Sequence, residues 1–238
     1  MIYVTGDIHG DYERWYKPEY QINSLDTSDI LIVCGDFGHV YYGDKEENEI
    51  LDELEEKGFM ILWCDGNHEN FELLEEFPIE IWNGGKVHRI RKNILHLMRG
   101  QVFEIEGNKI FVMGGGYSRD KHLRKEHESW WKQEMPSEEE YMEARNNLKK
   151  HDYCVDYIIS HAAPETIMDM YYPKHDGEKQ LNIFLEWVVT VVDAMQLKHH
   201  YFGHIHRDKE ISKKQTVLHY DVRKLVGNEK VVDKYNKK

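Results

Sequence analysis

The chain has 238 residues, of which 40% are hydrophobic and 12% aromatic, and its formal net charge is −13. This length and composition predict a single packed domain that spans residues 1–238. The acidic balance argues against tight binding to extended DNA or RNA, because such binding neutralises phosphates with many lysines and arginines. A nucleotide or a short oligonucleotide is still compatible with it.

No membrane segment is expected, because Glu186 and Asp193 interrupt the most apolar stretch and the first predicted strand follows Met1 without an apolar leader. The three cysteines lack C-x-x-C spacing, which fits a reducing compartment. We therefore expect a cytoplasmic protein.

Five short apolar runs predict buried strands, and each run leads into a cluster of polar residues. The strands are expected at residues 2–4, 30–34, 60–63, 157–159 and 201–202. The clusters are Gly6-Asp7-Ile8-His9, Gly35-Asp36-Phe37-Gly38, Gly66-Asn67-His68-Glu69, Ser160-His161-Ala162 and Gly203-His204-Ile205-His206. In open α/β sheets the loops beyond the carboxyl ends of the strands form one crevice, so we expect the five clusters to meet there.

Between these strands the sequence predicts helices over 46–57, 70–77 and 179–195, and a further helix that begins with a capping box of Ser137 and Glu140. The basic segment 86–92 alternates with apolar residues, so it could form a half-exposed strand or hairpin, or could guide an anionic substrate. Residues 171–177 are expected to form a loop, either at the edge of the site or in solvent.

The clusters offer imidazole, carboxylate and amide ligands, which suit Mn²⁺, Fe or Zn²⁺ better than Ca²⁺. Asp36 could bridge two cations about 3.5–4 Å apart, the usual spacing in two-metal hydrolases. The remaining ligands divide into two groups, Asp7, His9 and His206 for one cation and Asn67, His161 and His204 for the other.

The order of these clusters resembles that of the calcineurin-like metallophosphoesterase superfamily, whose pattern runs Asp-x-His, Gly-Asp, Gly-Asn-His-Glu or -Asp, a lone His and Gly-His-x-His. The resemblance extends from Thr5 to about His206. It implies an α/β fold, an α/β/β/α sandwich of two mixed sheets flanked by helices, with a two-metal centre at one edge. It also implies that His68 lies beside the leaving group rather than binding metal, with Asp36 or Asp7 orienting it.

Two further segments bear on the substrate. Many protein Ser/Thr phosphatases of the superfamily continue the second Gly-Asp to Asp-Arg-Gly, whereas this chain continues as Phe37-Gly38-His39-Val40, which disfavours a phosphoprotein substrate. The segment 114–121 is similar to the Gly-Gly-Ala-Tyr-Ser-x-Asp-Lys segment of bacterial and phage-associated members. Its basic residues and one that follows could meet a phosphate or could be solvated, namely Arg119, Lys121 and Arg124. The pair Trp130-Trp131 could wall a pocket or pin a helix to the core.

The sequence thus predicts a metal-dependent phosphoric ester hydrolase that acts on a phosphomonoester or phosphodiester through attack of a metal-bridging water, with Asp36 and His68 as catalytic residues. Two divalent cations are expected, Mn²⁺ first and Fe or Zn²⁺ as alternatives. A nuclease or nucleotide phosphodiesterase of the same fold is an alternative, as is a non-catalytic metal-binding scaffold, although the intact ligand set opposes the scaffold. No protein partner is indicated.

Overall fold

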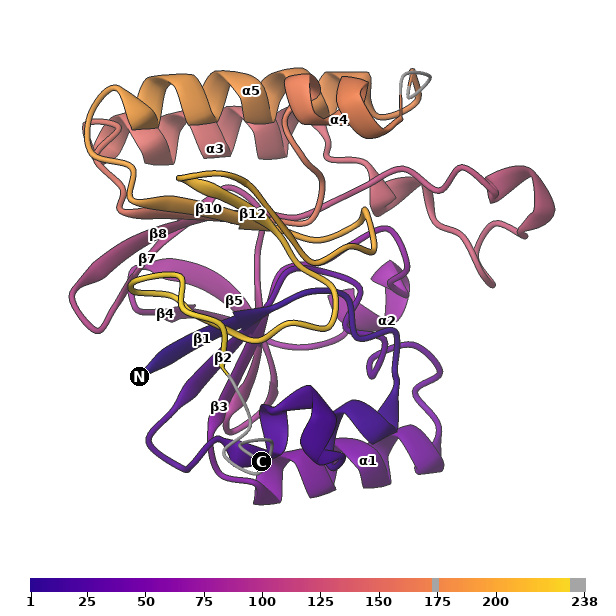
Figure 1. Cartoon of the computed structure of the whole chain (residues 1–238). Helices are drawn as coiled ribbons and strands as arrows, with labels where there is room; N and C mark the ends of the chain where they lie inside the picture. The colour runs from indigo at the N-terminus through magenta and orange to yellow at the C-terminus, as the bar shows by residue number, and fades with distance from the viewer. Residues whose placement is uncertain (173–175, 232–238) are drawn as a thin grey trace.

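The computed structural model describes residues 1–172 and 176–231, which form two mixed β-sheets packed face to face with helices on both outer sides (Figure 1). Residues 173–175 of the predicted loop at 171–177 lie outside the described part of the chain. The arrangement is the α/β/β/α sandwich that the sequence predicts.

The first sheet has seven strands in the order β13-β1-β2-β3-β6-β5-β4. Its central strands β1, β2, β3 and β6 run parallel, whereas β4, β5 and β13 pair antiparallel with their neighbours. The strands are β1 (Ile2–Thr5), β2 (Ile30–Val33), β3 (Met60–Trp63), β4 (Ile79–Trp82), β5 (Gly85–Arg91), β6 (Ile94–Leu97) and β13 (Arg223–Lys224).

The second sheet has six strands in the order β11-β12-β10-β9-β8-β7, with a parallel centre formed by β12, β10, β9 and β8. Its edge strands β7 and β11 pair antiparallel with their neighbours. The strands are β7 (Gln101–Ile105), β8 (Asn108–Met113), β9 (Tyr157–Ser160), β10 (His199–Phe202), β11 (Lys209–Ser212) and β12 (Gln215–Val217).

Helices cover the outer face of each sheet. In Figure 1, α1 lies below the first sheet and α2 to its right, and α3, α4 and α5 lie above the second sheet. The α-helices are α1 (Lys45–Glu56), α2 (Phe71–Glu75), α3 (Glu138–Lys150), α4 (Glu165–Tyr171) and α5 (Lys179–Asp193), and short 3-10 turns lie at Tyr12–Trp15, Pro18–Tyr20, Ile22–Ser24, Lys121–Leu123 and Lys132–Glu134. The capping box of Ser137 and Glu140 begins α3 as predicted.

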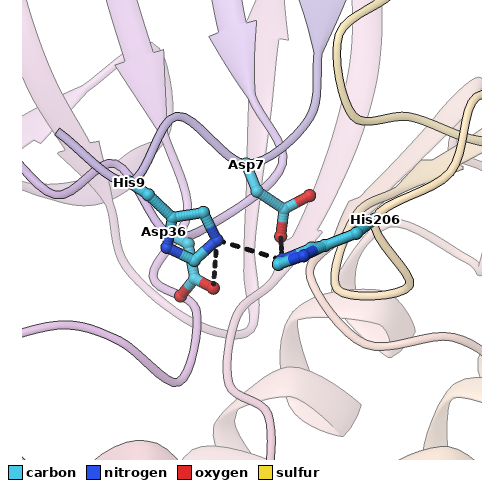
Figure 2. A group of neighbouring side chains, drawn as sticks. All are labelled: Asp7, His9, Asp36 and His206. Carbon is cyan, nitrogen blue, oxygen red and sulfur yellow. Dashed lines mark hydrogen bonds and ion pairs between the residues drawn. The ribbon is translucent and has the colours of Figure 1, made fainter. Parts of the chain in front are cut away.

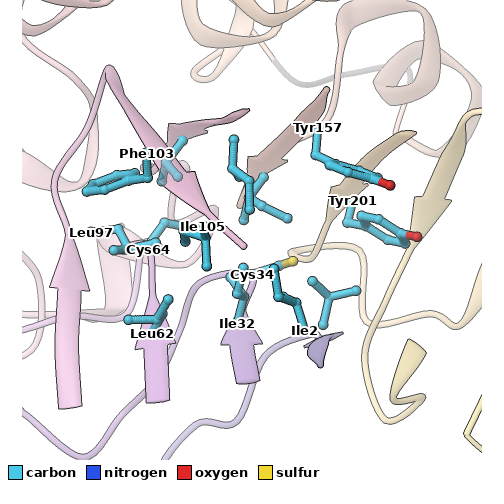
Figure 3. Packing of buried hydrophobic residues seen from close by; sticks show 14 of the residues in the cluster. Ile2, Ile32, Cys34, Leu62, Cys64, Leu97, Phe103, Ile105, Tyr157 and Tyr201 are labelled. Carbon is cyan, nitrogen blue, oxygen red and sulfur yellow. The ribbon is translucent and has the colours of Figure 1, made fainter. Parts of the chain in front are cut away.

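The core is layered because strand residues point alternately to opposite faces of each sheet. Ile32, Leu62, Tyr157 and Tyr201 are among the buried residues that fill the space between the sheets, as Figure 3 shows. Other clusters pack the outer face of each sheet against its helices, for example Leu51 and Leu54 of α1. Strands buried on both faces are nearly continuous apolar runs, which is why the sequence predicted them.

The basic segment 86–92 forms most of β5, and three of its basic side chains are ion-paired, those of Lys86, Arg89 and Arg91. The ammonium of Lys86 lies 2.6 Å from a carboxylate oxygen of Glu143, and Arg89 Nε lies 2.6 Å from Glu80. The first pair links β5 to α3, and the second links β5 to the edge strand β4. No helix in the described ranges 1–172 and 176–231 is long and apolar enough to cross a membrane.

Candidate metal centre

The five polar clusters meet at one edge of the sandwich. Three of them follow β1, β2 and β3, which are parallel neighbours in the first sheet, and two follow β9 and β10, which are parallel neighbours in the second. Because parallel strands end at the same side of a sheet, their loops converge. All seven residues that the sequence suggested as ligands lie in this one region, Asp7, His9, Asp36, Asn67, His161, His204 and His206.

The first group consists of Asp7, His9, Asp36 and His206, whose ligand atoms all lie within 4.8 Å of one another and point toward one another in Figure 2. His9 Nε2 lies 3.0 Å from His206 Nε2 and 3.5 Å from Asp36 Oδ2. His206 Nε2 lies 3.8 Å from Asp7 Oδ1. Two imidazole nitrogens and two carboxylates at these distances fit a single transition-metal cation.

The second group is built around His161, which is completely buried. His161 Nε2 lies 3.0 Å from Asn67 Oδ1, 3.1 Å from His204 Nδ1 and 3.5 Å from Asp36 Oδ2. On the other side of the ring, Nδ1 donates to the Cys34 carbonyl at 2.8 Å, so that the lone pair of Nε2 points into the ligand group. This group offers a second cation two nitrogens and two oxygens.

Asp36 belongs to both groups. Its Oδ1 accepts the backbone N–H of His68 at 2.8 Å, while its Oδ2 is buried without a hydrogen-bond partner among the described residues. Asp7 Oδ2 is buried and unpartnered in the same sense. Because burying an unpaired carboxylate oxygen is costly, these atoms fit a site that cations complete. Burial raises the pKa of Asp36, but the imidazoles of His161, His68 and His9 outweigh burial and hold this pKa below its ordinary value.

The backbone at the site is locally strained. Four of the candidate ligands have positive φ, His9 at 53°, Asp36 at 49°, His204 at 62° and His206 at 52°. Gly35 also has positive φ, and a Cβ there would lie 2.1 Å from the His161 ring, so only glycine fits. Strain of this kind persists where the surrounding structure fixes it, and it clusters at functional sites.

Buried groups behind the ligands fix their orientation. Asn67 Nδ2 donates to Ser118 Oγ at 3.0 Å, which turns the amide oxygen toward His161. His204 Nε2 lies 3.2 Å from Glu178 Oε1, so that Nδ1 faces the ligand group. Outer carboxylates of this kind hold a ligating histidine in one tautomer. No motif in the sequence marks Glu178, whereas Ser118 belongs to the glycine-rich segment that the sequence did single out.

Glu178 and His204 shift each other's pKa. Burial lowers the pKa of His204, but Glu178 outweighs burial and raises this pKa to about 9. Burial raises the pKa of Glu178, and His204 together with the backbone N–H of Tyr117 brings it down to about 2. The carboxylate is also held by Tyr117 N at 2.9 Å and Asn182 Nδ2 at 3.2 Å, so the pair is anchored at the start of α5.

Glu69 joins two of the loops. Its buried carboxyl group accepts the backbone N–H of Phe37 at 3.1 Å and of Gly66 at 3.3 Å, which ties the loop after β2 to the loop after β3. Burial and the neighbouring Asp36 raise the pKa of Glu69 well above its ordinary value. The acidic residue of the Gly-Asn-His-Glu motif thus acts here as a backbone clamp.

His68 stands beside the ligand groups. Its ring centroid lies 5.4 Å from that of His9, and its backbone N–H rather than its ring is bonded to Asp36. Burial is the main cause that lowers the pKa of His68 to about 4, against the opposing effect of Asp36. The imidazole is therefore neutral at pH 7 and carries one N–H donor.

In the described part of the chain, His68 and His206 line two cavities that open from the centre. The larger, of about 790 Å³, extends along the loop between β2 and α1, and Arg124 lines it. The smaller, of about 210 Å³, contains Arg119, whose guanidinium lies 3.7 Å from the Tyr172 ring centroid. Lys121 lines neither cavity and lies over the rings of Tyr117 and Trp130.

The fold and the site define a metal-dependent hydrolase. The family model for calcineurin-like phosphoesterases matches residues 1–208. The chain belongs to this family, whose members bind divalent metals, and it is a metal-dependent phosphoester hydrolase.

Solved structures with a similar fold have very different sequences. The protein TT1561 of Thermus thermophilus is 13% identical, with a TM-score of 0.51 over 97% of this chain and 96% of that one. The phosphopantetheinyl hydrolase PptH of Mycobacterium tuberculosis is 16% identical, with a TM-score of 0.49 over 92% of this chain and 89% of that one. Among curated proteins, none matches the chain.

Proposed function

We propose that this protein hydrolyses a phosphomonoester or phosphodiester with two divalent cations that share Asp36. The observation that carries the proposal is the buried, unpartnered Asp36 Oδ2, which lies 3.5 Å from His9 Nε2 and 3.5 Å from His161 Nε2. Each of these nitrogens belongs to a different ligand group. One carboxylate oxygen between two such groups is what a bridged pair of cations requires.

We assign one cation to Asp7, His9, Asp36 and His206, and the other to Asp36, Asn67, His161 and His204. Imidazole nitrogens mixed with carboxylate and amide oxygens favour Mn²⁺, with Fe or Zn²⁺ as alternatives. When bound, such a pair supplies a water that is nucleophilic at neutral pH and neutralises charge on the phosphoryl oxygens.

The side chains around the metals position the ester. Arg119 has no ion-pair partner among the described residues and lines the smaller cavity, where it can donate to a phosphoryl oxygen. His68 lies outside both ligand groups, so its neutral N–H can donate to the leaving oxygen as the bond to phosphorus breaks. A neutral imidazole keeps its proton and stabilises the charge that develops on the leaving oxygen through a hydrogen bond, and one such donor contributes about 10²–10³-fold to the rate.

The test is metal-dependent hydrolysis of 4-nitrophenyl phosphate and bis(4-nitrophenyl) phosphate by protein stripped with a chelator and reloaded with Mn²⁺. The matched variant is Asp36→Asn, because asparagine tolerates positive φ and its carbonyl can still accept the His68 N–H. We expect two Mn²⁺ per chain and turnover in the parent protein, and weakened binding of both ions with at least about 100-fold slower turnover in the variant. Full activity in Asp36→Asn, or one Mn²⁺ per active chain, would refute the shared ligand.

A further inference from the structure

The larger cavity beside His68 has walls of defined chemistry, and they indicate which alcohol the ester carries. We propose that this cavity binds a planar aromatic group that is uncharged or cationic, as the organic part of the phosphoester. The proposal rests on the proposed phosphoesterase function and deepens it. The cavity measures about 790 Å³, which is ample for one ring system beside the metal centre.

The loop between β2 and α1 lines the cavity together with His68, and its backbone is fixed. The buried carboxylate of Glu47 accepts the N–H groups of Tyr41 at 2.6 Å, Tyr42 at 3.1 Å and Gly43 at 2.7 Å. The Tyr41 carbonyl accepts Asn70 Nδ2 at 2.8 Å, which ties the loop to the start of α2, directly after the Gly-Asn-His-Glu cluster. The loop is therefore positioned by the same segment that carries His68.

This loop presents two aromatic rings to the cavity. The Tyr41 ring is half-buried and stands edge-on to Trp131, with centroids 5.8 Å apart and an interplanar angle of 89°. The Tyr42 ring lies 5.1 Å from that of Tyr41 and is 76% exposed. The Tyr41 ring thus forms a part of the cavity wall that Trp131 supports, and the Tyr42 ring forms a more solvent-exposed part of it. Rings of this kind contact planar groups by stacking or edge-to-face packing, at a low cost in side-chain entropy.

The charges around the cavity disfavour a second anionic group. Asp44, Glu46 and Glu47 line it, and the first two are exposed to solvent. The basic residue of the lining is Arg124, and Asp120 holds it through two contacts of 2.9 Å. Because three backbone N–H groups already occupy Glu47, and Asp120 pairs with Arg124, the exposed carboxylates of Asp44 and Glu46 set the charge of the cavity. Uncharged and cationic rings are favoured over rings that carry a carboxylate or a further phosphate, and a cation also gains from the tyrosine faces.

Phosphonates test this preference without turnover, because their C–P bond is not hydrolysed and a methylene replaces the ester oxygen. Binding to the Mn²⁺-reconstituted protein is measured by calorimetric titration at low salt. We expect benzylphosphonate to bind between about twofold and tenfold more tightly than cyclohexylmethylphosphonate, which has a non-planar ring of similar size. We expect 4-(aminomethyl)benzylphosphonate to bind at least about tenfold more tightly than 4-carboxybenzylphosphonate.

Variants test which residues cause the preference for a planar ring and the preference for a cationic substituent. Tyr41→Leu should reduce the preference for the planar ring to below about twofold, while the control Tyr12→Leu, which is outside the cavity, should preserve it. The double variant Asp44→Asn with Glu46→Gln should reduce severalfold the ratio of the affinity for the aminomethyl compound to that for the carboxy compound. Asparagine at position 44 keeps the side-chain cap on α1.

Equal affinities within both pairs, or a preference for the cyclohexyl or carboxylate compound, would overturn the proposed pocket. If the 4-nitrophenyl esters are hydrolysed with Mn²⁺ but the phosphonate preferences are missing, the specificity proposal alone fails. If the preferences are present and neither ester is hydrolysed, the proposed function alone fails.

Discussion

Glu178 makes a sharp prediction, because it contacts a candidate ligand of one cation only. In Glu178→Gln the negative charge beside His204 is lost, while the side chain keeps its size and the Oε1 that contacts both His204 Nε2 and the N–H of Tyr117. An amide nitrogen replaces the oxygen that accepts from Asn182. Replacing a group that orients a ligating histidine typically weakens metal binding by about 10- to 100-fold. This corresponds to about 1.4–2.7 kcal/mol at 25 °C, which is modest beside the several bonds that still hold that cation.

The expected result is one weakened Mn²⁺ and one unchanged Mn²⁺ in a calorimetric titration of the chelator-treated protein. Turnover of the 4-nitrophenyl esters should fall at low Mn²⁺ and recover when the Mn²⁺ concentration is raised about 100-fold. The control is Asp193→Asn at the other end of α5, whose carboxylate pairs with Lys214 at the surface and should leave both affinities unchanged. Equal loss of both ions, or an activity that excess Mn²⁺ does not restore, would refute the orienting role.

Three further predictions concern catalysis, folding and pH. His68→Ala should keep both Mn²⁺ ions and lower kcat by about 10²–10³-fold, and unchanged turnover would reject its proposed role. Arg99→Met should lower the free energy of unfolding by about 3–5 kcal/mol in urea denaturation, because it leaves the buried Asp65 carboxylate without its guanidinium. The control Arg89→Met, whose ion pair is more exposed, should lower this free energy by less than about 1 kcal/mol. Similar losses in the two variants would contradict the prediction. Burial lowers the pKa of His200 to about 3, so the unfolded chain binds more protons there and stability should fall as pH drops from about 6.5 toward 3. This dependence should be shallower in His200→Gln, and an unchanged slope would argue against it.

Much of the fold was readable from the sequence because the relevant signals are local. The apolar runs at residues 30–34 and 60–63 became β2 and β3 because strands in the middle of a covered sheet are apolar on both faces. The capping box at Ser137 fixed the start of α3 through hydrogen bonds within one turn. Helix α4 was not predicted, since it has seven residues and Pro164 at its N-cap provides no side-chain cap.

The candidate ligands were also visible in the sequence, because each follows a strand and the carboxyl ends of parallel strands share one edge. Residue types and order were enough to suggest two groups around Asp36. The distances within the two groups could not be predicted in this way, since the 3.0 Å contact between His9 and His206 joins residues 197 positions apart. Such a contact depends on how the two sheets pack.

The residues that orient the metal ligands and that line the substrate cavity follow only from the tertiary structure. Glu178 lies in a segment without a motif, and it becomes important because the start of α5 packs beside His204. Tyr41 sits in a loop that no motif in the sequence marks, and it becomes part of the cavity wall because Glu47 and Asn70 fix its backbone. Side-chain contacts between distant segments follow from the packing of the whole core, which no local pattern encodes.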